Sequence, residues 1–350
     1  MDLLEKASII LTPTAYNNGE ALCVKPSDGS GDFDFSRNSA ATRVNAQGLV
    51  ENVQILSGNL VQNGDFSEEG VEEVSNGSFS QEGVEIVTNG SFDTDSDWIK
   101  GTGWSISGGK AISNGTSGNL YQSGIIVTGK QYKIQATVSD YVSGNVEVSA
   151  GAVPRGTMSA NGTYTFYQTA SSTSNLFIIS NSFEGSIDNV SVREVGQDWT
   201  LGTGWSIGED KAVANTTGGT NGCLQTSTIT SGKIYKATFE VLDYQSGSVR
   251  INLGGSGLTG VGNLVSANGV YTQYITSDGV DVYIQGRSGF IGSITNISVK
   301  EVGQNWTLFS GWSIGNGVAI SDGSATGIQQ SPLLTIDSTY QITATVAGNP

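Results

Sequence analysis

The sequence predicts an all-β protein, built from tandem antiparallel β-sandwich modules that follow a distinct N-terminal segment. Three observations carry this prediction. A unit of about 100 residues recurs, its apolar residues alternate with polar ones, and turn dipeptides fall every ten or so residues. Glycine supplies 49 of the 350 residues and proline only 5, a composition that suits many short strands joined by turns.

Pairs of tryptophans mark the repeated unit. Trp98-Ile-Lys-Gly-Thr-Gly-Trp104-Ser-Ile returns as Trp199-Thr-Leu-Gly-Thr-Gly-Trp205-Ser-Ile, and again as Trp306-Thr-Leu-Phe-Ser-Gly-Trp312-Ser-Ile. A large aromatic residue held at one position of every repeat is typical of packing, so we expect the tryptophans to be buried and not to be sugar platforms. The third copy stops early, and we expect the natural protein to continue past residue 350.

Alternation identifies the inward face of one strand in each module. Tyr132, Ile134, Ala136 and Val138 share a face, as do their counterparts Tyr235, Ala237, Phe239 and Val241. Cys223 occupies the position that Leu120 has in the first module, so it is predicted to be a small core residue. Module length changes in the turns after Asn114 and Asn215, and in 153–159 against 254–266. We expect these to be surface loops, where a binding module diversifies.

A shorter repeat precedes the modules. Asn63-Gly-Asp-Phe66, Asn76-Gly-Ser-Phe79 and Asn89-Gly-Ser-Phe92 recur with a period of 13 residues, separated by glutamate-rich runs. Only the last copy adjoins a tryptophan unit. We therefore interpret it as the opening of module one, and modules two and three as lacking such an opening. The earlier copies are expected to form an acidic connector that pairs between chains or serves as a stalk. The expected division of the chain is 1–58 N-terminal segment, 59–91 connector, 84–196 module one, 197–303 module two and 304–350 incomplete module three.

Composition excludes several chemistries. The chain has no histidine, which removes histidine bases and ligands, and its two cysteines lie too far apart in sequence for a metal or redox motif. A net charge of −16 argues against nucleic-acid binding. The acidic N-terminus does not resemble a signal peptide, and no stretch has the length of a membrane span. No pair of carboxylates stands out, so we expect no enzymatic activity.

Two candidate sites follow from residue type. Tyr141 and Tyr244, beside Ser-Gly turns, are the candidate exposed aromatics for ligand binding. Asp93, Asp95 and Asp97 alternate as calcium ligands do, although the segment is not an EF-hand and a solvated acidic turn is the alternative. No other cofactor is expected.

The Asn-Gly-Ser-Phe opening, the tryptophan that follows and the closing run Ile187-Asp-Asn-Val-Ser-Val resemble the galactose-binding-like carbohydrate-binding modules. This resemblance implies jelly-roll sandwiches that bind glycans, often with a structural calcium. Residues 32–45, which include Arg37 and Arg43, look like the head of virion fibre proteins from tailed bacteriophages. That resemblance implies an N-terminal virion anchor that contains both arginines, and a homotrimer.

The expected function is therefore that of a non-enzymatic structural protein of the virion surface, a tail or head fibre. Its N-terminal segment would contact other virion proteins, and its repeated sandwiches would adhere to host-surface glycans. Two alternatives stay open: the accessory carbohydrate-binding region of a secreted bacterial glycan-degrading enzyme, and a structural spacer without a ligand.

Overall fold

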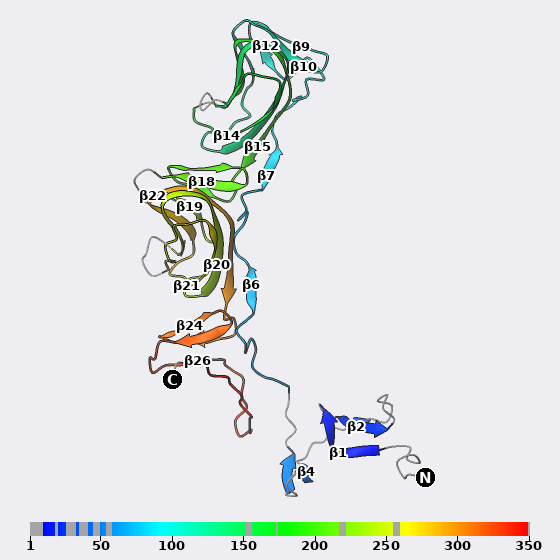
Figure 1. Cartoon of the computed structure of the whole chain (residues 1–350), viewed down its shortest axis with the longest axis vertical. Helices are drawn as coiled ribbons and strands as arrows, with labels where there is room; N and C mark the ends of the chain where they lie inside the picture. The colour runs from blue at the N-terminus through cyan, green and yellow to red at the C-terminus, as the bar shows by residue number, and fades with distance from the viewer. Residues whose placement is uncertain are drawn as a thin grey trace. The chain divides into compact units, whose positions relative to one another are not determined.

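A computed structural model describes residues 58–151, 156–172, 174–216, 222–254 and 260–348 in full, together with the backbone of the strands before residue 54. The chain divides into two units, one of residues 62–331 and one of residues 1–61 with 332–350. All regular structure in the described residues is β-strand (Figure 1), which confirms the predicted all-β class. No helix long and apolar enough to cross a membrane occurs among the described residues.

The unit that holds the N-terminus contains two small antiparallel sheets. One has the order β1-β2-β3 and the other pairs β4 with β5. Arg43 lies in β4 opposite Glu51 in the backbone register, but its side chain and the whole of Arg37 lie outside the described residues. The strands are β1 Ile10–Asn17, β2 Glu20–Lys25, β3 Phe33–Asp34, β4 Ala41–Val44 and β5 Val50–Val53.

The first sandwich, module 1, is an antiparallel sheet that folds back on itself. Its path is β13-β12-β15-β10-β9; β11 and β7 pair with β15, β8 pairs with β11, and β14 pairs with β12. The strands are β7 Glu82–Glu85, β8 Ile99–Lys100, β9 Trp104–Ser107, β10 Lys110–Asn114, β11 Gly118–Gln122, β12 Gln131–Ala150, β13 Gly156–Met158, β14 Gly162–Thr169 and β15 Leu176–Val195.

The two long strands, β12 and β15, bend sharply in the middle. Their register shifts between Ser139 and Asn145, where Asp140 and Gly144 have φ of 54° and 73°. A Cβ on Gly144 would lie 2.1 Å from the carbonyl oxygen of Ser182, so this crossing requires glycine. The bend lets both halves of each strand contribute to one core.

Module 2 repeats this topology. β22 takes the place of β15 and pairs with β18, β19, β20 and β6. Its strands are β6 Glu69–Glu72, β16 Thr200–Leu201, β17 Trp205–Gly208, β18 Lys211–Asn215, β19 Gly222–Gln225, β20 Ile234–Leu253, β21 Gly269–Thr276 and β22 Val282–Val302. The third copy retains β23 Thr307–Leu308, β24 Trp312–Gly315, β25 Val318–Ser321 and β26 Ile328–Gln329. Residues 217–221 and 255–259, inside the expected variable loops, lie outside the described residues.

Burial confirms the predicted inward faces. The four apolar residues of each face, starting at Tyr132 in β12 and Tyr235 in β20, are at most 2% exposed. Leu120 and Cys223 are both fully buried, and burial raises the pKa of the Cys223 thiol. The tryptophans of modules 1 and 2 are buried as expected, whereas Trp306 and Trp312 of the third copy are half-buried.

The 13-residue repeat differs from its expected role as an acidic connector that pairs between chains or serves as a stalk. Strand β7 pairs with β15 of module 1, and β6 pairs with β22 of module 2, all within one chain. Phe92, Phe79 and Phe66 lie against Trp98, Trp199 and Trp306, with ring centroids 5.1, 5.2 and 5.2 Å apart. Each indole Nε1 donates a hydrogen bond to the carbonyl oxygen of the asparagine in the same copy: Asn89 at 3.0 Å, Asn76 at 3.1 Å and Asn63 at 3.0 Å.

Modules two and three therefore do possess the opening, which reaches them from upstream. The opening segment of module 1 is residues 80–92, that of module 2 is 67–79, and that of module 3 is 62–66. Module 1 is thus inserted into module 2, which is in turn inserted into module 3. The insertion is feasible because the residues of module 2 that flank module 1 meet: the Asn76 amide donates to the carbonyl of Gln197 at 3.2 Å. Asn63 and Gln304 repeat this contact at 3.3 Å.

Short joins connect the modules. β15 ends at Val195 and β16 begins at Thr200, so the connection is only a few residues long. A Cβ on Gly196 would lie 2.7 Å from Ile207 of the next module, and one on Gly303 would lie 2.3 Å from Ile314. The module joins are therefore in direct contact with the first hairpin of the following module.

Candidate functional site

The two tyrosines predicted to be exposed ligand-binding residues take part in the packing of their own modules. Tyr141 and Tyr244 are half-buried, and their rings lie 6.3 and 6.5 Å from Phe183 and Phe290. Each hydroxyl donates to the carbonyl of a glycine three residues further on, Gly144 or Gly247, at 3.0 Å. Each ring thus covers the bend of its long strand, and its hydroxyl is already engaged.

The three aspartates of the calcium candidate do not converge. Asp93 accepts a hydrogen bond from Ser91 at 2.7 Å, Asp97 accepts one from Ser96 at 2.6 Å, and Asp95 pairs with Lys100. Among the described residues, no group of three acidic or cysteine side chains is placed to hold a metal ion. The arrangement is that of an exposed acidic turn, the alternative considered from the sequence.

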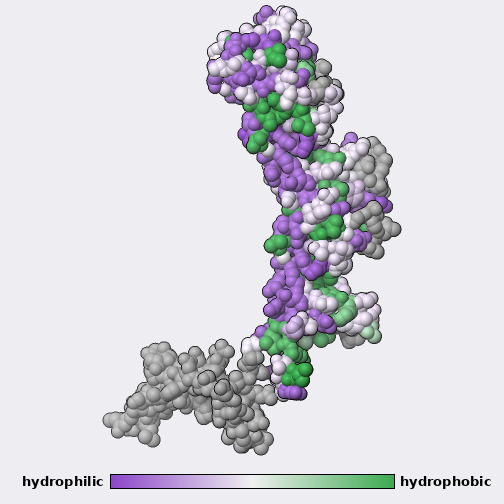
Figure 2. Space-filling model, turned by 180° about the vertical axis from the view of Figure 1, so that it is seen from behind, coloured by the Kyte–Doolittle hydropathy of each residue, from purple (hydrophilic) through white to green (hydrophobic). Residues whose placement is uncertain are grey.

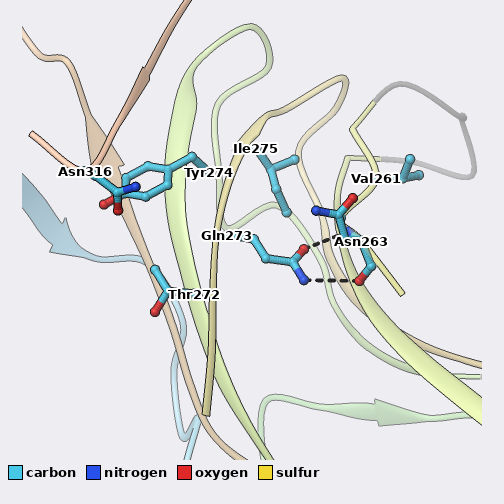
Figure 3. A pocket seen from close by; sticks show the side chains of 8 residues that line it. Val261, Asn263, Thr272, Gln273, Tyr274, Ile275 and Asn316 are labelled. Atoms are coloured by element: carbon cyan, nitrogen blue, oxygen red, sulfur yellow. Dashed lines mark hydrogen bonds between the residues drawn. The ribbon is translucent and has the colours of Figure 1, made fainter. Parts of the chain in front are cut away.

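A polar hollow of about 280 Å³ lies at the edge strand β21 of module 2 (Figure 3). Thr272 and Tyr274 line it on one face of the strand, and Gln273 and Ile275 line it on the other face, where residues 261–263 of the variable loop lie. Asn316 enters from the turn between β24 and β25. Among the described strands β21 pairs with β20 alone, and residues 261–263 of the loop lie beside it.

Gln273 is held in place by the loop. The Asn263 backbone N–H donates to Gln273 Oε1 at 2.8 Å, and Gln273 Nε2 donates to the Asn263 carbonyl at 3.1 Å (Figure 3). The side-chain amide thereby forms the pair of backbone hydrogen bonds that a neighbouring strand would form. A Cβ on Gly262 would lie 2.2 Å from Gln273 Oε1, so this close approach depends on glycine.

Tyr274 of module 2 and Asn316 of the third copy complete the lining. Tyr274 is half-buried, and a Cβ on Gly315 would lie only 3.4 Å from its ring. The exposed Asn316 has φ of 53°, a conformation that asparagine tolerates better than most residues. The lining has an aromatic face, amides and a hydroxyl, but no carboxylate or cation. It offers hydrogen bonds and ring stacking to a neutral ligand, and it offers no acid–base pair.

In module 1 the same position is filled. Phe166 stands opposite Ile134 as Gln273 stands opposite Ala237, so Phe166 and Gln273 are equivalent. Phe166 packs against the core and stacks on Tyr164, with centroids 6.2 Å apart. A Cβ on Gly156 would lie 2.4 Å from the Phe166 ring. The hollow of module 2 thus arises from a different side chain and a longer loop on the same scaffold.

A second hollow, of about 350 Å³, lies where modules 1 and 2 meet. Tyr167, the counterpart of Tyr274, lines it together with Lys211 and Asp243. Lys211 lies 3.0 Å from Asp243, and the hydrogen bond from this lysine is the main cause of the lowered pKa of Asp243. This hollow is charged, whereas the one at β21 is neutral.

Sequence reasoning pointed to the variable loop but missed the residues opposite it. The signal was present in the alignment of the modules, where Gln273 replaces Phe166 beside the segment that lengthens from 153–159 to 254–266. A polar residue at a position that is apolar in the other module, next to a longer loop, indicates a local change of role.

No protein-family model matches the chain, and a search of curated proteins finds no match. Among solved structures, the chain is similar to the tandem CBM22 modules of Xyn10C from Paenibacillus barcinonensis, at 11% identity and a TM-score of 0.24 over 63% of this chain and 99% of that one. It is also similar to allantoicase from Saccharomyces cerevisiae, at 9% identity and a TM-score of 0.24 over 55% and 80% of the two chains.

A third similar structure is a Paenibacillus xanthan lyase, at 15% identity and a TM-score of 0.21 over 60% of this chain and 25% of that one. At such TM-scores these likenesses carry no argument about function. The assignment of β-sandwich modules rests on the strand pairing and the two apolar cores.

Proposed function

We propose that this chain is a non-enzymatic virion fibre protein whose β-sandwich modules bind host-surface glycans. The observation that carries the glycan-binding part is the neutral hollow at the edge of β21, where the Tyr274 ring lies near Asn316 on one face of the strand and Gln273 lies on the other face (Figure 3). Sugars offer hydroxyls to amides and an apolar ring face to tyrosine, and they carry no charge that the site would need to neutralise. A hollow of about 280 Å³ fits one sugar residue or the end of a chain.

The virion part of the proposal is supported by the sequence of residues 32–45. In this proposal the segment up to residue 58 anchors the protein to the particle through other virion proteins, and the copies form a homotrimer. Because β6 and β7 are paired within their own chain, the contacts between copies lie away from these strands unless the strands are exchanged between chains.

Glycan binding is tested on the full chain with an array of neutral oligosaccharides. We expect Thr272→Val and Asn316→Gly to weaken binding about tenfold each, since each removes one ligand hydrogen bond worth roughly 1.5 kcal/mol. Thr165→Val, at the equivalent position of module 1, and Asn305→Gly, another exposed asparagine at φ of 73°, are the matched controls. Binding that survives both hollow variants, or no binding to any glycan, would contradict the site and favour a spacer.

The virion assignment is tested separately. Antibodies raised against residues 197–303 should decorate purified phage particles in electron micrographs. Finding the protein only in the culture medium of uninfected bacteria would instead support the accessory region of a secreted enzyme. Incubation with any bound oligosaccharide should release no shorter product.

A further inference from the structure

Module 2 holds its opening segment through contacts of the kind that bind a separate peptide. Residues 67–79 are separated from the rest of module 2 by the whole of module 1, so chain continuity alone does not hold them in place. The Ser75 backbone N–H donates to Gln225 Oε1 at 3.2 Å, and Gln225 Nε2 donates back to the Ser75 carbonyl. Gln225 is 2% exposed, so these two hydrogen bonds come from a buried side chain.

Charge and burial complete the recognition. Glu69 pairs with Lys236 at 2.6 Å and with Lys300 at 3.2 Å, and Glu72 accepts the Val299 backbone N–H at 2.7 Å. Two apolar side chains enter the core: Val74 is 7% and Phe79 is 1% exposed. Gly77 lies so close that a Cβ there would be 2.0 Å from the carbonyl oxygen of Ile297.

Module 1 holds residues 80–92 by the same contacts. Gln122 clasps Thr88, with the Thr88 N–H 3.3 Å from Oε1, Glu85 accepts the Val192 N–H at 2.8 Å, and Glu82 pairs with Lys133 at 2.6 Å. The two opening segments are identical at ten of thirteen positions. The three differences, Glu68/Gln81, Glu73/Ile86 and Ser75/Thr88, are at residues that are exposed or half-buried, and of these Ile86 packs against the core of module 1.

We propose that the site on module 2 formed by β22, Gln225 and Trp199 accepts the 13-residue opening segment of a second copy of this chain. The occupant is a second copy because every chain carries this recognition sequence more than once, and side chains rather than covalent adjacency select it. Reciprocal exchange closes a dimer and cyclic exchange closes a ring, and neither needs a contact absent from the single chain.

The test uses the full chain with protease sites inserted after the exposed residues Ser67 and Ser80, so that the excised piece, residues 68–80, contains the contact residues Glu69 to Phe79 of the opening segment. After cleavage, the excised segment should remain bound through gel filtration. A fluorescent synthetic peptide of residues 67–79 should then replace it with one-to-one stoichiometry, measured by anisotropy, while the uncut chain takes up far less peptide. Immediate loss of the segment, or failure of the peptide to enter, would overturn the proposal.

Peptide variants test the recognition itself. Gly77→Val and Phe79→Ala in the peptide should each abolish replacement, whereas Val71→Ala should not change it, because Val71 is 77% exposed. The peptide of residues 80–92 should bind within about tenfold of the 67–79 peptide. Equal binding of all variants would mean nonspecific association and would overturn the proposal.

Exchange between copies is measured on the uncut chain. After partial unfolding and refolding at high protein concentration, sedimentation velocity should show dimers or larger closed species, and the Gly77→Val chain should not form them through module 2. If the chain refolds only to monomer at every concentration, the second copy is not an occupant of the site.

Discussion

Phe79→Ala should destabilise module 2 although residue 79 precedes all of module 1 in the sequence. The Phe79 side chain is 1% exposed and packs on Trp199 at 5.2 Å between centroids. Truncation of a buried phenylalanine to alanine costs about 3–5 kcal/mol, from lost burial and the cavity left behind. Opening of module 2 should therefore become about 100- to 5,000-fold more frequent.

Cys223 supplies a local assay. The thiol is fully buried, and burial raises its pKa, so it should react with a thiol reagent only when module 2 opens. In a Cys23→Ser background, the labelling rate of Cys223 reports opening of module 2 under conditions where reclosing is faster than labelling. Phe79→Ala should raise this rate by the factor given above.

The matched control is Phe92→Ala, which removes the equivalent ring from module 1. Phe92 is also 1% exposed and packs on Trp98 at 5.1 Å, so its truncation should cost module 1 a similar amount. It should leave Cys223 labelling nearly unchanged. If Phe92→Ala accelerates Cys223 labelling as much as Phe79→Ala does, the assignment of opening segments to modules is wrong.

Three further outcomes are expected. Gly196→Ala should lower the thermal unfolding temperature more than Gly232→Ala, because both residues have positive φ but only at Gly196 would the Cβ meet a neighbour, Ile207 at 2.7 Å. A hydrogen bond from Lys236, and to a smaller extent one from Lys300, lowers the pKa of Glu69 from its usual value of 4.5. The ionised carboxylate therefore stabilises module 2 above pH 4.5, and this stabilisation is lost as the pH falls through the lowered pKa. Denaturant titrations of the Glu69→Gln variant at several pH values should lack this loss. Chelation with EDTA should leave the unfolding temperature of module 1 unchanged, because Asp93, Asp95 and Asp97 each bind a different side chain. A lower unfolding temperature in EDTA would support the predicted calcium site.

The sequence by itself determined the class of fold, the module repeat and the buried faces. Alternation along β12 and β20 is a local property, because successive side chains of a strand point to opposite sides whatever the strand pairs with. Alignment of the modules was likewise enough to place Cys223 in the core beside the position of Leu120. The packing role of the four tryptophans in modules 1 and 2 followed from their constant positions.

Only the tertiary structure decided which module each 13-residue segment completes. Residues 67–79 and 80–92 carry nearly the same side chains, so no local pattern distinguishes their partners. The choice follows from closure of the folded chain: module 1 brings its own ends together, and Asn76 then reaches Gln197. The hollow at β21 likewise joins Gln273, the loop at 261–263 and Asn316, which are distant in sequence and meet only because the strands pair as they do.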